Sequence, residues 1–197
     1  SSFVLVNSLP VAAFDSIFPC TPTTRSCIPQ PGTPNRIDIL SYRQRLMHRL
    51  AYRNFGTHES LVANHSVEAS VGMAGVRWYE IRSPNNAPII YQQGTYAPND
   101  GIHRWMGSIA MDKQGNIGLG YSVSDGVSTF PGLRYTGRLA GDPLGTLPQG
   151  EGTIINGSGW QGHSAGRWGD YSNMSVDPVD DCTFWYTNQY YSSFLNG

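Results

Sequence analysis

The chain has 197 residues and a formal net charge of -1, and charged side chains make up only 14% of it, against about 25% in ordinary globular proteins. It is rich in glycine, with 23 residues, and in aromatic residues, at 12%. This composition excludes a helical bundle or coiled coil and favours an all-β fold with many turns. Near-neutral charge argues against a nucleic-acid partner, and no apolar run reaches the roughly 18 residues of a membrane span.

Residues 1–41 are expected to form an irregular N-terminal arm with one short strand at SFVLV, because the prolines of IPQPGTPNR exclude a central strand or a helix there. Cys20 and Cys27 lie seven residues apart, and Cys182 is remote. Two alternatives stay open: three reduced thiols, or a Cys20–Cys27 disulfide in a secreted protein. No second CxxC and no paired histidine accompanies them, so a zinc site is not expected.

After residue 41, four short sequence motifs, called words below, recur in the same order. GVRWYEIR, which starts at Gly75, is similar to GLRYTGR at Gly132, and each is followed by a second shared word, QQGT or QGEGT. An Arg-Trp pair recurs at 104–105 and 167–168, and the words MDKQGNIGLGYS and VDPVDDCTFWYT follow these pairs. Such self-similarity at a nearly fixed period indicates a repeat architecture.

Each copy divides into four short strands separated by turn residues, which is the pattern of a β-propeller blade. We therefore expect a propeller-like repeat domain over residues 42–197, with about ten antiparallel strands in two and a half four-stranded blades. The expected blades lie near residues 42–97, 103–158 and 167–191. The segment LSYRQRLMHRLAYR, residues 40–53, could form a helix, but its place in the repeat favours the innermost strand of the first blade.

A closed propeller carries roughly four to eight blades, so two and a half blades would leave open strand edges at both ends. We expect these edges to be covered by self-association into a homo-oligomer, by the N-terminal arm, or by the rest of a larger chain. The alternative is that the strands curl into a closed β-barrel.

The Trp-containing strands and the Asp-x-x-Gly-Asn hairpin of MDKQGNIG resemble secreted bacterial β-propellers of the sialidase-like, BNR-type superfamily. The resemblance covers residues 42–191 at the level of blade architecture. The Ser-x-Asp-x-Gly-x-x-Trp box of that superfamily is absent, since MDKQGNIG and VDPVDDCT keep the Asp and the turn without the spaced Trp. The resemblance implies a secreted or cell-surface bacterial protein and no particular reaction.

Residues shared between the copies are expected to be structural. Arg77 and Arg134 recur because each blade needs the same packing, and Asp112 opens a hairpin, where its side chain would accept backbone N–H groups. The acidic run DPVDD is expected to be a solvated turn. Calcium is the alternative ligand for its three carboxylates, which are Asp177, Asp180 and Asp181. No other cofactor is expected.

Positions that differ between the copies are the candidate functional residues. The second copy inserts Glu151 in QGEGT, and the third carries Asp170 close to Arg167. Paired carboxylates suit glycoside hydrolysis, in which one protonates the leaving oxygen and the other activates water or attacks the anomeric carbon. On this hypothesis Glu151 is the acid and Asp170 the base or nucleophile, oriented by Arg167. The residues expected to contact a substrate are Trp160, His163, Arg167 and Tyr171.

Two functions therefore remain open. We favour a binding or scaffold module that recognises a glycan or a protein surface through exposed aromatic and amide side chains, or that completes the ring of a larger protein. The alternative is a secreted glycoside hydrolase with its paired carboxylates on the blade-connecting loops. The fold alone does not decide between them, because propellers host both functions.

Overall fold

The computed structural model describes residues 4–5, 7–16, 20, 24–39 and 45–193. In this part the regular elements are all β-strands, and they all pair antiparallel, which confirms the all-β prediction. The described residues form twelve strands, where about ten were expected. None of the four sheets closes into a barrel, so the barrel alternative is wrong. The strands are β1 (Ser26–Gln30), β2 (Thr33–Asp38), β3 (Ala51–Asn54), β4 (Glu59–Ser70), β5 (Met73–Arg82), β6 (Ile89–Tyr96), β7 (His103–Met111), β8 (Ile117–Ser124), β9 (Gly132–Arg138), β10 (Glu151–Ile155), β11 (Asn173–Val176) and β12 (Phe184–Thr187).

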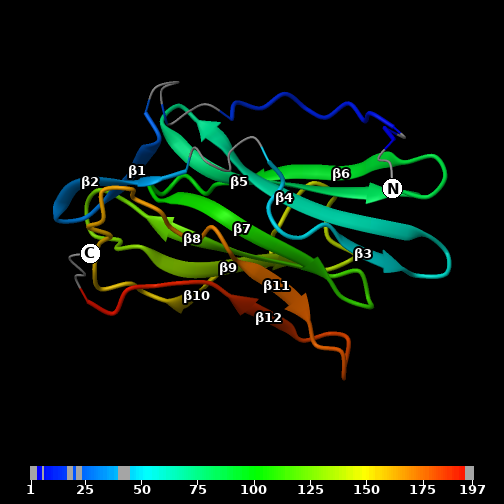
Figure 1. The fold of residues 1–197 in the computed structure, drawn as a ribbon. Helices are drawn as coiled ribbons and strands as arrows, with labels where there is room; N and C mark the ends of the chain where they lie inside the picture. Colours follow the sequence, from blue (N-terminus) through cyan, green and yellow to red (C-terminus); the bar gives the residue numbers. More distant parts are fainter. Residues whose placement is uncertain (1–3, 6, 17–19, 21–23, 40–44, 194–197) are drawn as a thin grey trace.

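The sheets stack as layers in chain order (Figure 1). Strands β3 to β6 form the first four-stranded sheet, β7 to β10 form the second, and β11 and β12 form a two-stranded sheet beneath it. Strand β7 packs against β4 and β5 on one side and against β11 on the other. For this reason all nine of its residues are buried. The arrangement is consistent with propeller-like blades, of which the last has only two strands in the described part.

The arginine-rich segment at 40–53 contains no helix in its described part, which begins at Arg45. Strand β3 begins at Ala51 and pairs with β4 at the edge of the first sheet, so the segment contributes a short strand instead of a helix, and its innermost position in a blade stays a prediction. Residues 40–44 lie outside the described residues.

The first part of the N-terminal arm, residues 7–16, lies across the outer face of the first sheet (Figure 1). The backbone N–H of Ala12 donates to Gln93 Oε1 at 3.0 Å, and Phe14 packs edge-on against His65 with ring centroids 4.7 Å apart. The arm therefore covers a sheet face. The strand expected at residues 2–6 falls mostly outside the described residues.

The later part of the arm is not irregular as expected, because residues 26–38 form the hairpin of β1 and β2. Pro29 and Pro34 are tolerated there because each strand of this two-stranded sheet has an edge that needs no hydrogen-bond partner.

Cys20 and Cys27 form a disulfide. Of the two alternatives for the cysteines, the Cys20–Cys27 disulfide is therefore confirmed, and three reduced thiols are excluded. Cys182 is a free, half-buried cysteine. The disulfide packs with the β1–β2 hairpin in a buried apolar cluster that also takes in the second sheet and the connection to β11. The large buried members of this cluster are Ile28, Ile37, Trp105 and Trp168.

Strand β8 shows why the layers pack closely. Its side chains alternate between the two faces, and Tyr121 faces the first sheet within a buried apolar cluster. On the opposite face, a Cβ on Gly120 would lie 2.7 Å from the ring of Tyr186, and one on Gly118 would lie 2.9 Å from the ring of Phe184. The rings of β12 therefore rest directly on the backbone of β8, which only glycine permits.

This contact makes Gly120→Ala a test of the layered packing. We expect the variant to lose about 1–3 kcal/mol in free energy of unfolding, because the added methyl must displace the Tyr186 ring. Gly141→Ala is the matched control, since no atom lies within 4 Å of its Cβ position, and it should change the free energy by less than about 0.5 kcal/mol. Urea unfolding of both variants measures the difference, and equal stabilities would contradict the packing.

His103, at the start of β7, is a buried group that predicts a pH dependence. Its Nδ1 accepts from the backbone N–H of Ala74 at 3.2 Å. Burial, reinforced by the nearby charge of Arg36 and opposed by Asp125, lowers its pKa from 6.5 to about 4. The unfolded chain therefore binds a proton that the folded chain does not accept between these two values.

We expect the protein to lose about 3 kcal/mol of stability from this group as the pH falls from 6.5 to 4, and none further from it below that. His103→Asn, which keeps a neutral acceptor, should flatten this part of the profile. Urea unfolding at a series of pH values decides, and an unchanged slope in His103→Asn would refute the assignment.

Candidate functional site

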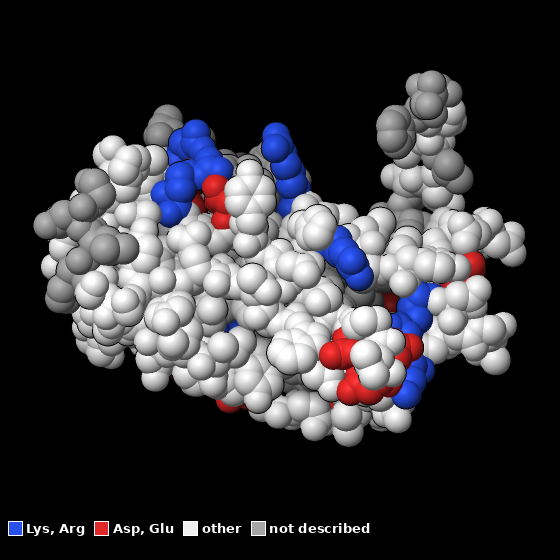
Figure 2. Space-filling view, turned by 60° about the horizontal axis from the view of Figure 1, so that its bottom comes forward, with Lys and Arg blue, Asp and Glu red and all other residues white. Residues whose placement is uncertain are grey.

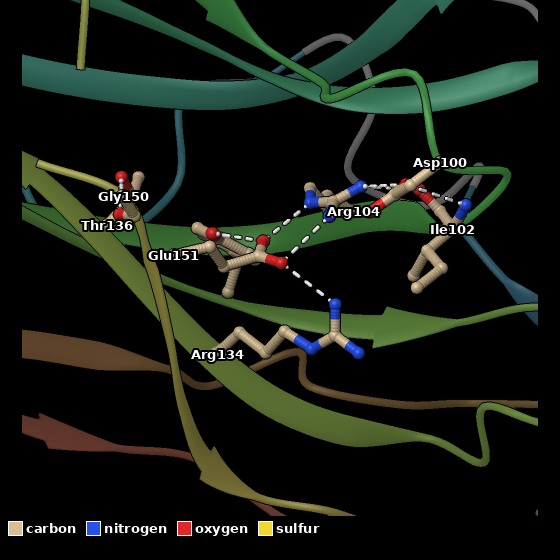
Figure 3. Close-up of polar contacts among 8 residues, drawn as sticks. Asp100, Ile102, Arg104, Arg134, Thr136, Gly150 and Glu151 are labelled. Atoms are coloured by element: carbon tan, nitrogen blue, oxygen red, sulfur yellow. Dashed lines mark hydrogen bonds and ion pairs between the residues drawn. The ribbon is translucent and has the colours of Figure 1, made fainter. Parts of the chain in front are cut away.

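A charged cluster centred on Glu151, at the start of β10, joins the strands of the second sheet (Figure 3). Its carboxylate accepts from Arg104 Nε at 2.7 Å and Nη2 at 2.9 Å, from Arg134 Nη1 at 2.8 Å and from Tyr121 OH at 2.6 Å. These donors lie on β7, β9 and β8. One carboxylate therefore links all four strands on the face that looks toward the first sheet.

The guanidinium of Arg104 is fully buried and lies between two carboxylates. On its other side it donates to Asp100 Oδ1 at 3.0 Å and Oδ2 at 2.7 Å. Burial lowers the pKa of Arg104, but the hydrogen bonds to Asp100 and Glu151 outweigh burial and raise it. A buried cation without these partners would be strongly destabilising, so the cluster holds the charge of Arg104 in the interior.

The same cluster determines the protonation of Glu151. Burial raises the pKa of its carboxyl, but the hydrogen bonds from Arg104, Tyr121 and Arg134 lower this pKa by a larger amount. The net pKa of Glu151 therefore lies below its usual value. A general acid needs a raised pKa, so that its proton is present near neutral pH. The environment of Glu151 favours the carboxylate instead, which suits a structural ion pair better than a proton donor.

Glu151 occupies the position that Gln93 has in the first sheet. Arg77 Nη2 donates to Gln93 Oε1 at 2.5 Å, as Arg134 does to Glu151. Each acceptor lies on the last strand of its sheet, two residues before the cross-strand partner of the arginine. Glu151 is therefore a replacement within the repeated framework and not an insertion. Its negative charge is what the second sheet needs, because only there does a buried Arg104 face it.

Asp170 lies in a different place. Arg167 Nε donates to Asp170 Oδ2 at 2.6 Å, so the expected pairing of these two residues is present. The adjacent Trp168 donates its indole N–H to Ser122 Oγ at 3.1 Å, on the face of β8 opposite to the Glu151 cluster. The second sheet thus lies between the surroundings of the two carboxylates, and the structure does not bring them together as a pair.

The other expected substrate contacts lie on the connection between β10 and β11. Tyr171 is 90% exposed and Trp160 is half-buried. His163 is exposed, and its Nδ1 accepts from the backbone N–H of Ala165 at 3.1 Å within a turn. Their roles in binding stay predictions.

The three aspartates of DPVDD satisfy their carboxylate oxygens with protein donors. Asp177 accepts from the Val179 backbone N–H and the Trp185 indole. Asp180 accepts from Thr183. Asp181 pairs with both terminal nitrogens of an arginine, Arg53, at 2.6 and 2.8 Å. Among the described residues no group of three or more His, Cys, Asp or Glu side chains is arranged to hold a metal ion.

A cleft of about 980 Å³ lies beside β12 and was not predicted from the sequence. Its floor is the outer face of β8, β9 and β10, and its wall is formed by Phe184 and Tyr186 of β12. Tyr135, which is 50% exposed, and Ile154, which is 45% exposed, lie on the floor. This side of the molecule comes forward in Figure 2, where much of the middle of the surface is uncharged.

The cleft exists because the third layer is narrower than the second. The rings of β12 rest on β8 and β11 packs against β7, so the two strands leave β9 and β10 uncovered. The sequence contained a signal for this cleft, namely the count of two and a half blades. That count indicated an open layer, but it did not show which strands would be exposed.

Comparison of the chain with known protein families, with curated proteins and with solved structures finds no match. The resemblance to sialidase-like propellers therefore stays a prediction. In the described part of the chain, no helix is long and apolar enough to cross a membrane.

Removing the charge of Glu151 tests its structural role. We expect Glu151→Gln to lower the free energy of unfolding by about 3 kcal/mol, because it leaves the buried Arg104 with one carboxylate instead of two. Asp170→Asn, which loses an ion pair with an arginine whose side chain is 42% exposed, should cost less than about 1 kcal/mol. Urea unfolding at pH 7 compares them.

The pH dependence provides a second readout for the same variant. Because the folded pKa of Glu151 is lowered, its contribution to stability is present above the unfolded value near 4.5 and is lost as the pH falls through the folded value. Glu151→Gln should therefore lose less stability than the parent protein on acidification below pH 4.5. A smaller effect than that of Asp170→Asn, with an unchanged acid profile, would rule out the structural role.

Proposed function

We propose that this protein is a non-catalytic protein-binding or scaffold module, and that its partner binds in the cleft beside β12. The observation that carries the proposal is the mismatch between the four-stranded second sheet and the two-stranded layer that covers it. The uncovered floor offers apolar surface at Tyr135 and Ile154, and β12 offers a strand edge beside it. Apolar surface next to an open strand edge is a typical site for recognition of an extended polypeptide.

The chemistry of the cleft supports a polypeptide partner. The side chains of Tyr135, Ile154, Phe184 and Tyr186 on its floor and wall are uncharged, which favours apolar side chains of a ligand. The charged residues that also line it, Asp112, Arg138 and Glu151, are hydrogen-bonded within the protein. The amide side chains of Gln114 and Gln149 also line it, and they can pair with backbone groups of a bound segment. The Cys20–Cys27 disulfide supports a secreted or cell-surface location for this binding.

The hydrolase alternative has less support. It needs two carboxyl groups that flank one bond, with one of them protonated. Glu151 has a lowered pKa within an ion-pair cluster, and the surroundings of Asp170 lie on the other face of the sheet. We therefore keep glycan hydrolysis as an outcome that the experiment below can detect.

Selection of peptides from a displayed random library tests the proposal. Peptides that bind the full chain should bind Ile154→Glu at least tenfold more weakly, because the new carboxylate lies in the apolar floor. Val127→Glu is the matched control, since Val127 is 86% exposed on the turn between β8 and β9, and it should bind as the parent does. Isothermal titration with synthetic copies of the selected peptides gives the affinities.

The same preparations should neither bind nor cleave members of a glycan array. Selected peptides that bind Ile154→Glu as tightly as the parent would contradict the proposed site. Glycan hydrolysis that is lost in Asp170→Asn would contradict the non-catalytic assignment and favour the hydrolase.

A further inference from the structure

The third layer repeats the first half of the second sheet. Asp177 and Tyr186 follow Asp112 and Tyr121 by the same interval of 65 residues. The faces also correspond, because Tyr121 looks toward the first sheet and Tyr186 rests on Gly120 of the second. Strands β11 and β12 are therefore the structural counterparts of β7 and β8, and each layer presents the same face to the layer before it.

In the second sheet, the counterpart of β12 has a neighbour on each side. Strand β8 pairs with β7 and also with β9, where Tyr121 is opposite Arg134. In the part of the chain that the structure describes, β12 pairs with β11 alone. A strand added at its other edge would lie over β9, which is the floor of the cleft.

The contact between the first and second sheets shows what kind of segment covers such a floor. Trp78 and Gly94 face each other across β5 and β6. The loop between β9 and β10 lies on them: a Cβ on Gly94 would overlap the carbonyl oxygen of Gly145, and Leu147 packs in one buried cluster with Trp78. The backbone N–H of Gly145 also donates to Gln92 Oε1 at 3.0 Å. A hairpin loop thus covers this part of the first sheet.

The floor of the cleft has the same pattern. Tyr135 and Gly152 face each other across β9 and β10, as Trp78 and Gly94 do across β5 and β6. In the second sheet no hairpin loop of the described chain covers the pair, and Tyr135 is 50% exposed. The aromatic-glycine pair that one layer buries beneath a loop is therefore left open in the next.

We infer that the cleft accepts a β-hairpin of the β9–β10 kind from a partner chain, so that the third layer is completed to four strands. This inference rests on the proposed function and names the partner of that site. The first strand of the hairpin pairs antiparallel with the free edge of β12, and its loop lies over Tyr135 and Gly152. Backbone hydrogen bonds supply affinity, and the apolar floor selects bulky uncharged side chains at alternate positions.

The chain itself contains the probe for this inference. A synthetic peptide of residues 132–157, which spans β9, its loop and β10, is titrated into the full protein. We expect it to bind the parent and Val127→Glu at least tenfold more tightly than Ile154→Glu. A control peptide with Tyr135→Pro, which cannot donate a backbone hydrogen bond in the strand, should bind at least tenfold more weakly than the unmodified peptide.

Hydrogen exchange identifies the binding mode. If the peptide adds a strand, backbone amides within Phe184–Thr187 that are not paired with β11 should exchange at least tenfold more slowly in the complex. Cleft-dependent binding without this protection would overturn strand addition and leave the proposed function intact. Absence of binding by the hairpin peptide, while library peptides bind in the cleft, would likewise overturn only the hairpin. Failure of all peptides at the cleft would overturn both.

Discussion

Strand β7 carries the main constraint of this structure, because layers pack against it from both sides. The neighbours of a strand that is buried on both faces must fit it closely, although β7 contains an irregularity in its pairing with β8 between Trp105 and Ser108. On one side β4 and β5 supply apolar side chains. On the other side glycines of β8 let the rings of β12 approach the backbone. The low charge and high glycine content of the chain follow from this stacking.

The guanidinium of Arg104 is one of several charged groups buried in this interior, and its burial explains the ion pairs around Glu151. A fully buried cation needs charged acceptors with good geometry, and Asp100 and Glu151 provide them from opposite sides. Arg134 and Tyr121 then complete the hydrogen bonding of Glu151. A carboxylate that departs from the repeat pattern can therefore be structural. Glu151 replaces the glutamine of the first sheet because the second sheet contains a buried arginine that needs a charged partner.

The open cleft follows from the same stacking principle. Each four-stranded sheet exposes a face that the next layer must cover, and the third layer covers only the side formed by β7 and β8. Nothing about the floor at Tyr135 and Gly152 differs in kind from the covered pair at Trp78 and Gly94. The difference lies in what packs on it, and this is why we propose a binding role in place of paired catalytic carboxylates.

From the sequence alone, the strands of the two four-stranded sheets and their order could be predicted, but the β1–β2 hairpin could not, because Pro29 and Pro34 argued against strands there. Alternation in IGLGYSV specifies which side chains of β8 share a face, and the recurrence of Arg77 at Arg134 specifies equivalent strands, because both are local or periodic properties of the chain. The partnership of Arg104 with Glu151 could not be predicted, since it joins the first and last strands of a sheet through a register that only pairing establishes. The separation of Glu151 from Asp170, and the cleft over β9 and β10, likewise depend on which face each layer presents to the next. Those faces are determined by packing in three dimensions, so only the tertiary structure decided them.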